Sequence, residues 1–265
     1  MVAVRMAEPS VPTGDPQRRR VERAMGTMIS LYLPEGGADR AAADATFAWL
    51  HEVDERFSPF KPESEVSRLI AGEIPFAQAS ADLAEVLAIA EAVEALSGGA
   101  FDIRGFRPDG APDPTGVVKG WSVDRAGSIL AEAGVDRFYI SAGGDVLVRG
   151  GQERGVPWKV GVAHPFVPDA VALVLQGDDL AVATSGTTER GHHIADPHSG
   201  QAADELLTIT VAGPDLGRAD AYATAAFAMG REGLRWVEVL PGYYAAGITH
   251  DARLITTRGL DRLRA

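Results

Sequence analysis

Residues with the chemistry of a metal site lie in segment 219–230, which otherwise consists mostly of small and apolar residues. Asp220 and Thr224 are four positions apart in this segment, so on a helix they share one face. A carboxylate and a hydroxyl on one face can hold a hard cation between them. Alternatively, Asp220 caps the start of the helix, because Asp is favoured at that position. The sequence leaves both interpretations open.

A turn and a helix in the middle of the chain could bind an anion. Residues 113–116, Asp-Pro-Thr-Gly, predict a tight turn whose backbone groups can face a ligand. The helix expected from about Val117 directs its positive end to the same place, with Lys119 close by. These groups suit a phosphate. An ordinary connection with a surface lysine has the same composition, so this alternative also stays open.

Three further segments carry polar residues that could line such a site. The turn 143–145, Gly-Gly-Asp, permits a positive φ, and its Asp could cap nearby amides. Segment 184–190, TSGTTER, follows later in the chain. In segment 192–200, HHIADPHSG, His193 could exchange a proton near neutral pH. Each segment is also typical of solvated loops, so none is decisive alone.

Taken in this order, the segments resemble the ApbE family of flavin transferases, which use FAD to attach FMN covalently to a threonine of a protein. The resemblance implies an α+β fold of helices and antiparallel sheets, with an ApbE-type, T-fold-like architecture. It rests on Met25-Gly26-Thr27, Ser58, residues 64–69 (SEVSRL) and 99–102 (GAFD), Lys119-Gly120, residues 143–145, Ser185-Gly186, residues 193–197 (HIADP) and Ala219-Asp220 with Thr224.

The resemblance also implies the site residues. Mg²⁺ is expected to bind the side chains of Asp220 and Thr224 and the carbonyl of Gly116. His193, Asp220 and Lys119 are expected to act in catalysis, and His193 is the first candidate for deprotonating the acceptor. The expected FAD site is lined by Met25, Phe60, Ala100, Phe101, Asp102, Asp113, Lys119, His193 and Ala195.

Some positions depart from the family pattern. Phe60 stands where the family commonly has a tyrosine, so a stacking ring is kept and a hydroxyl is lost. Ile70 and Ala71 follow Arg68-Leu69 where an asparagine is frequent. The interval between Asp102 and Asp113 is shorter than in many members, so the flavin enclosure is expected to differ there.

The activity that the resemblance implies is Mg²⁺-dependent transfer of FMN from FAD to a threonine hydroxyl of an acceptor protein. The product is a phosphoester, and AMP is released. Two alternatives remain open. In a Mg²⁺-dependent FAD pyrophosphatase, water replaces the threonine and the products are FMN and AMP, whereas a non-catalytic FAD-binding protein would leave FAD unchanged.

Composition narrows the classes of partner. The 265 residues, 46% of them hydrophobic, can form a large core. We expect a flexible tail at residues 1–20 and an ApbE-like domain at 21–265, formed either as one unit or as two closely packed lobes. The formal net charge of −12 disfavours nucleic-acid binding. The sequence has no cysteine and no apolar run long enough for a signal peptide or membrane span, so we expect a cytoplasmic protein without membrane insertion.

Hydrophobic periodicity predicts the elements that position these residues. A strand at 27–33 precedes a helix that starts at Asp39 and buries Phe47, Leu50, Val53 and Phe57. Ser80 is expected to cap a second helix, with Leu83, Val86, Leu87, Ala90 and Val93 facing inward and Gly98-Gly99 ending it. Further strands are expected at 138–140, 146–148, 159–162, 171–175 and 180–183, a half-buried one at 207–211, and a closing hairpin at 243–248 and 254–257.

Overall fold

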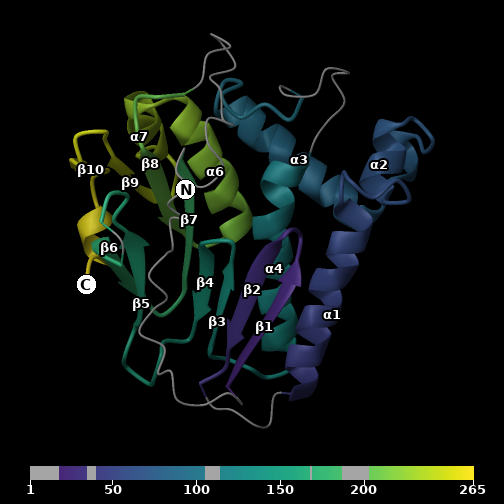
Figure 1. Ribbon diagram of the computed structural model, residues 1–265, viewed down its shortest axis with the longest axis horizontal. Coiled ribbons are helices and arrows are strands. Elements are labelled where there is room, and N and C mark those ends of the chain that lie inside the picture. The colour runs from purple at the N-terminus through teal and green to yellow at the C-terminus, as the bar shows by residue number, and fades with distance from the viewer. Residues whose placement is uncertain (1–17, 35–39, 105–113, 168, 187–202) are drawn as a thin grey trace.

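The molecule is built around one large antiparallel sheet with helices packed on one face (Figure 1). The computed structural model describes residues 18–34, 40–104, 114–167, 169–186 and 203–265. Within these residues, the sheet contains eight strands in the order β1-β2-β3-β4-β7-β8-β9-β10, and all neighbouring pairs are antiparallel. Strands β5 and β6 form a separate antiparallel pair. The predicted α+β fold with antiparallel sheets is confirmed.

Two tight turns at one end of the sheet have both central residues at positive φ. They are Met25-Gly26 between β1 and β2, and Gly143-Gly144 between β3 and β4. Such turns join antiparallel strands because their twist matches that of the strands. The strands are β1 Arg19–Ala24, β2 Thr27–Tyr32, β3 Phe138–Ala142, β4 Asp145–Arg149, β5 Trp158–Ala163, β6 Val171–Gly177, β7 Leu180–Gly186, β8 Thr208–Gly213, β9 Tyr244–Ile248 and β10 Leu254–Thr256.

The helices form a layer against this sheet, in which α4 and α6 are neighbours. The helices are α1 Arg40–Phe57, α2 Glu65–Ile70, α3 Ala81–Leu96, α4 Thr115–Glu132, α6 Leu216–Ala228 and α7 Arg231–Val237, with 3-10 turns at Phe76–Gln78 and Leu260–Leu263. None of the helices within the described ranges combines the length and the apolar character that a membrane span needs.

Both faces of the sheet are covered, so the molecule has two hydrophobic cores. On one face, side chains of α1, α3, α4 and α6 pack against the sheet. On the other face, residues of β5 and β6 such as Trp158 and Leu175 pack against β3, β4 and β7. Strand β8 is consequently buried at every position, so the expectation that segment 207–211 is half-buried was wrong. Thr210 is accommodated inside because its Oγ1 lies 2.9 Å from Thr184 Oγ1.

Local patterns were accurate for the long helices. In α1, all of the residues expected on the inner face are buried. Ser80 caps α3 as predicted, because its hydroxyl accepts the N–H of Leu83 at 3.2 Å. The buried residues of α3 are the five that periodicity indicated. The closing hairpin of β9 and β10 also forms.

Elements without a clear apolar pattern were not predicted. Strand β1 begins at Arg19, inside the segment expected to be a flexible tail, and pairs with β2 along its whole length. Charged residues hide its alternation, since four of the six are Arg or Glu. Helices α2 and α7 span six and seven residues, which is too short for a periodic signal.

Candidate active site

Charged side chains from three elements meet at one end of the sheet. Lys119 Nζ on α4 lies 3.1 Å from Asp220 Oδ2 on α6 and also contacts Asp145 Oδ2 at the start of β4. The Asp145 side chain is only 2% exposed and that of Asp220 12%. One ammonium between two carboxylates leaves a net negative charge in a largely buried place. Such a place attracts a further cation.

Asp220 does not cap α6. The helix begins at Leu216 with Asp215 at the N-cap position, so Asp220 lies in its second turn. The capping interpretation of Asp220 was therefore wrong. Almost all residues of α6 are buried, and its alanines let it approach α4, β7 and β8 closely. This packing turns the face with Asp220 and Thr224 toward Lys119 and β7.

Asp145 is held in place by the sheet itself. The Gly143-Gly144 turn delivers it to the first position of β4, and its Oδ1 accepts the N–H of Thr184 on β7 at 3.1 Å. Its second oxygen is left for Lys119. From the sequence, Asp145 was assigned only a role in capping nearby amides. The amide that it caps lies 39 residues away in sequence, so the Lys119 contact had no local signal.

Thr224 is close to a second hydroxyl that sequence reasoning did not place in the metal site. Its Oγ1 lies 3.2 Å from Oγ of Ser185, which is buried on β7. Ser185 is part of the family resemblance, but the sequence predicts no separate role for it. The arrangement brings two hydroxyls to the same end of the sheet as the carboxylates.

The first turn of α4 faces a buried aromatic ring. Helix α4 begins at Thr115 rather than Val117, with Pro114 at its N-cap. A Cβ atom at Gly116 would lie 3.2 Å from Cζ of Phe101, so the ring packs directly against the glycine. Ala100 and Phe101 are buried, while Asp102 is partly buried and its Oδ1 accepts the N–H of Arg104 at 2.7 Å. The structure therefore brings together Phe101 and Gly116.

Met25 adopts a backbone conformation that is uncommon for its residue type. Its φ is +52° in the β1–β2 turn. The backbone N–H donates to Asp54 Oδ1 on α1 at 2.9 Å, and Sδ lies 3.5 Å from Ser122 Oγ on α4. Contacts from two helices thus hold this turn beside α4.

Phe60 lies in the connection between α1 and α2 and is 91% exposed. Two contacts between residues before and after Phe60 hold the connection in place. Lys61 Nζ pairs with Asp54 Oδ2 at 2.9 Å, and Ser64 donates to the Ser58 carbonyl at 2.6 Å. An exposed ring on a connection that is held in place is available for stacking with a flat ligand.

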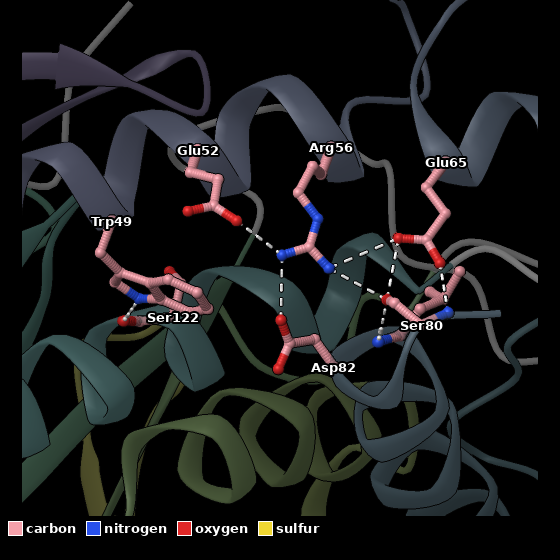
Figure 2. A network of polar contacts seen from close by, with 8 residues as sticks. Trp49, Glu52, Arg56, Glu65, Ser80, Asp82 and Ser122 are labelled. Atoms are coloured by element: carbon pink, nitrogen blue, oxygen red, sulfur yellow. Dashed lines mark hydrogen bonds and ion pairs between the residues drawn. The ribbon is translucent and has the colours of Figure 1, made fainter.

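A network around Arg56 joins the helices next to this connection (Figure 2). The Arg56 guanidinium donates to Glu52 at 2.8 Å, to Asp82 at 3.0 Å and to the Ser80 hydroxyl at 3.0 Å. Glu65, at the start of α2, accepts the N–H of Ser80 at 2.5 Å. Because these residues belong to α1, α2 and α3, the network sets where the Phe60 connection leaves the helix layer.

The remaining predicted residues, Asp113, His193 and Ala195, lie outside the described residues. Within the described part of the chain, no group of three or more His, Cys, Asp or Glu residues could hold a metal ion. The donors near Lys119 are instead two carboxylates and two hydroxyls, those of Asp145, Asp220, Thr224 and Ser185. An all-oxygen set with net negative charge fits a hard cation such as Mg²⁺, which also keeps water or phosphate oxygens as ligands.

These features define an α+β protein in which an antiparallel sheet and two close helices carry an oxygen-rich, lysine-containing site. The chain belongs to the ApbE family, whose model matches residues 25–105 and 108–246. This confirms the resemblance seen in the sequence.

Relatives with a stated activity share one name. An FAD:protein FMN transferase from Vibrio cholerae is 26% identical over 240 residues, which cover 69% of this chain and 72% of the relative. Against a relative of the same name from Escherichia coli, 29% identical, the match spans 38% of the relative's length. The relatives' name describes a transferase enzyme.

Solved structures have the same fold. The flavin transferase ApbE from Vibrio cholerae superposes with a TM-score of 0.81 at 21% identity, covering 92% of this chain and 98% of that one. The ApbE protein from Thermotoga maritima gives a TM-score of 0.81 at 22% identity, covering 93% and 99%. At these identities the likeness establishes the fold, including the helices and the antiparallel sheet.

Proposed function

We propose that this chain is an FAD:protein FMN transferase that moves FMN from FAD to a threonine hydroxyl of an acceptor protein in a Mg²⁺-dependent reaction. The observation that carries the proposal is the buried contact of Lys119 with Asp145 and Asp220, beside the hydroxyls of Thr224 and Ser185. The name shared by the relatives supports the same reaction.

Asp220, Thr224 and the Gly116 carbonyl would hold the magnesium ion. When bound, Mg²⁺ neutralises charge on the pyrophosphate of FAD and polarises its phosphorus–oxygen bonds. The protein's part is to supply oxygen ligands on elements that cannot move apart. Asp220 and Thr224 meet that requirement, because α6 is buried on nearly all sides.

Lys119 on α4 would also bind the pyrophosphate. Its ammonium is fixed between two carboxylates before any substrate arrives, so little reorganisation is needed to place a positive charge against a phosphate oxygen. The N-terminus of α4, which begins four residues before Lys119, would add the positive end of the helix dipole at the same anion. Positioning and electrostatics are the main contributions in phosphoryl transfer.

The flavin would lie between the α1–α2 connection and the start of α4. Phe60 offers an exposed ring for stacking. Met25, Ala100, Phe101, Asp102 and Asp113, with Ala195, would complete the enclosure. Of these, Met25 and Phe101 contact α4 directly, at Ser122 and Gly116. Helix α4 would then contact both the phosphate end and the flavin end of one FAD molecule.

In the transfer step, the acceptor threonine oxygen forms a bond to the phosphorus of the FMN unit. The pyrophosphate bond to AMP breaks, and AMP leaves with the electron pair of that bond. The threonine proton passes to a base, for which we propose His193, since an imidazole titrates near neutral pH. Lys119 would stabilise the charge that builds up on the phosphate oxygens.

The test is to incubate the protein with FAD, Mg²⁺ and a candidate acceptor protein, followed by intact mass of the acceptor and nucleotide analysis. We expect an acceptor heavier by one FMN phosphoester, together with AMP. Free FMN and AMP with an unmodified acceptor would identify a pyrophosphatase instead. Unchanged FAD with every acceptor tried would contradict any catalytic role, and omission of Mg²⁺ is the control for the metal.

A further inference from the structure

Helices α4 and α6 touch at their backbones. A Cβ atom added to Gly120 would lie 2.6 Å from the Leu216 carbonyl oxygen and 2.8 Å from Gly217 Cα. A Cβ atom added to Gly217 would lie 3.1 Å from Trp121 N. No side chain larger than hydrogen fits at Gly120 without movement of the backbone. The glycines therefore bring the helices together but do not by themselves determine how far one slides along the other.

A carboxylate on α4 bonds the first residues of α6. Asp124 Oδ1 accepts the N–H of Leu216 at 2.9 Å, and Oδ2 accepts the N–H of Gly217 at 2.8 Å. These amides belong to the first turn of α6, where N–H groups have no partner within the helix. The two oxygens of one side chain thus hold two successive amides, and this fixes the start of α6 in both position and direction.

The N-cap residue of α6, Asp215, does not bond these amides with its side chain. Within the described residues, Asp215 makes no side-chain cap hydrogen bond, although Asp is among the best residues at this position. Its carboxylate instead accepts the Tyr243 hydroxyl at 3.0 Å and pairs with Arg218 at 3.3 Å. The cap of α6 is therefore supplied by its neighbour helix, 92 residues earlier in the chain.

The same pair of helices carries the charged pair of the active site. Lys119 and Asp124 lie about a turn apart on α4, and Leu216 and Asp220 lie about a turn apart on α6. The two contacts, Asp124 with the start of α6 and Lys119 with Asp220, run between the helices in antiparallel order. A displacement of the start of α6 along α4 would therefore change the distance between Lys119 and Asp220.

We infer that Asp124 is a positioning residue: its carboxylate holds the start of α6 against α4 and so sets the spacing of Lys119 and Asp220. The catalytic consequence rests on the proposed function, in which those two residues bind the pyrophosphate and the metal. The structural part stands on the contacts alone. A carboxylate at a helix N-terminus is also favoured by the helix dipole, which adds to the two hydrogen bonds.

The test compares wild type with Asp124→Asn, Asp124→Glu and the control Asp136→Asn. Asn keeps one carbonyl oxygen but turns an NH₂ group toward the second amide, so one bond is lost. Glu keeps the charge on a longer side chain. Asp136 is an exposed carboxyl beyond the C-terminal end of α4, and its substitution should change neither readout. Circular dichroism and thermal melting establish that each variant is folded.

The first readout is hydrogen exchange of peptides that contain the amides of Leu216 and Gly217. We expect exchange to be faster by about 10-fold or more in Asp124→Asn, since hydrogen bonds to charged groups restrain local opening strongly. Asp124→Glu should fall between wild type and Asp124→Asn. Exchange at wild-type rates in a folded Asp124→Asn would overturn the inference, whatever the protein catalyses.

The second readout is the Mg²⁺ concentration that gives half-maximal FMN transfer, measured per folded enzyme. We expect it to rise about 3- to 10-fold in Asp124→Asn, because a displaced Asp220 is a poorer ligand. A variant that merely loses folded protein would lower the rate at all Mg²⁺ concentrations equally, which would contradict the positioning role. If wild type itself needs no Mg²⁺, the proposed metal role fails, and the exchange readout still decides whether Asp124 holds α6.

Discussion

The two ends of the proposed FAD site are built in opposite ways. At the phosphate end, Lys119, Asp145 and Asp220 are largely buried and already in contact with one another. At the flavin end, Phe60 is almost fully exposed on a connection held by ion pairs such as Lys61 with Asp54. The charged contacts at the phosphate end are formed before substrate arrives, whereas the flavin end presents an exposed ring that a ligand can cover.

The difference is consistent with the chemistry that each end would perform in the proposed transfer. Charge that develops during phosphoryl transfer is best stabilised by groups that need not reorganise, which requires a rigid and partly dry environment. Stacking of a flat ring requires only an accessible face. Substitutions at the phosphate end should therefore affect catalysis, and also stability where they leave a buried charge without its partner, whereas substitutions at the flavin end should affect binding alone.

The largest effect is expected for Asp220→Ala. The variant should lose Mg²⁺-dependent FMN transfer by about a factor of 10³, because it removes a proposed metal ligand and the partner of Lys119. It should remain folded, since Asp220 contributes no apolar packing and Lys119 keeps its contact with Asp145. Transfer assays across a range of Mg²⁺ concentrations measure the loss. Wild-type rates in this variant would exclude Asp220 from the metal site.

Lys119→Met should show most clearly that the phosphate end, unlike the flavin end, contributes to stability. The change leaves the carboxylate of Asp145 buried without its cationic partner, which typically costs about 3 kcal/mol or more. It should also lower kcat/KM about 100-fold, since a preorganised charge near the phosphates is lost. Denaturant unfolding and steady-state kinetics test both effects. The double variant Lys119→Met with Asp145→Asn should recover part of the stability, because the orphaned charge is then removed.

The sequence predicts the features of this fold that depend on residues close together in the chain. The Ser80 cap and the inner face of α3 follow from residues a few positions apart. Helix α6 was also expected, although its start at Leu216 was missed and Asp220 was left open as a cap. The i, i+4 spacing of Asp220 and Thr224 correctly indicates a shared face, which is why that pair could be singled out at all.

The contacts that position the site have no such local cause. Asp145 binds the amide of Thr184, and Asp124 binds those of Leu216 and Gly217, across gaps of 39 and 92 residues or more. The Gly-Gly turn before Asp145 indicates only a local cap, and nothing near Asp124 in sequence distinguishes it from a surface carboxylate. Only the sheet order and the close approach of α4 and α6 reveal them. Sequence patterns therefore singled out Lys119, Asp220 and Thr224 but not the groups that hold them in place.

The phosphate end should also respond to pH through Asp124. The pKa of Asp124 is raised from 3.8 to about 6, chiefly by burial and in part by Asp215, against the lowering effect of the two amide bonds and Arg149. Because the folded state binds this proton more tightly than the unfolded state, its stabilising contribution is complete below about pH 4 and lost as the pH rises through about 6.

Asp124→Asn isolates this contribution. The unfolding free energy of wild type relative to Asp124→Asn should fall by up to about 3 kcal/mol between pH 4 and pH 7, given roughly 1.4 kcal/mol for each unit of pKa. Urea denaturation at several pH values measures the difference. A difference that stays constant over this range would mean that Asp124 titrates normally and that its environment is less desolvated than its position indicates.

The smallest effect is expected at the flavin end. Phe60→Ala should raise the KM for FAD by about 5-fold, corresponding to roughly 1 kcal/mol for the loss of one stacked ring. It should leave the melting temperature unchanged, because a ring that is 91% exposed contributes little to the folded state. Phe60→Tyr keeps the ring and serves as the matched control, with a KM close to that of wild type. A Phe60→Ala variant that melted earlier while binding FAD normally would reverse the comparison, since the connection would then belong to the framework and the ring would not meet the flavin.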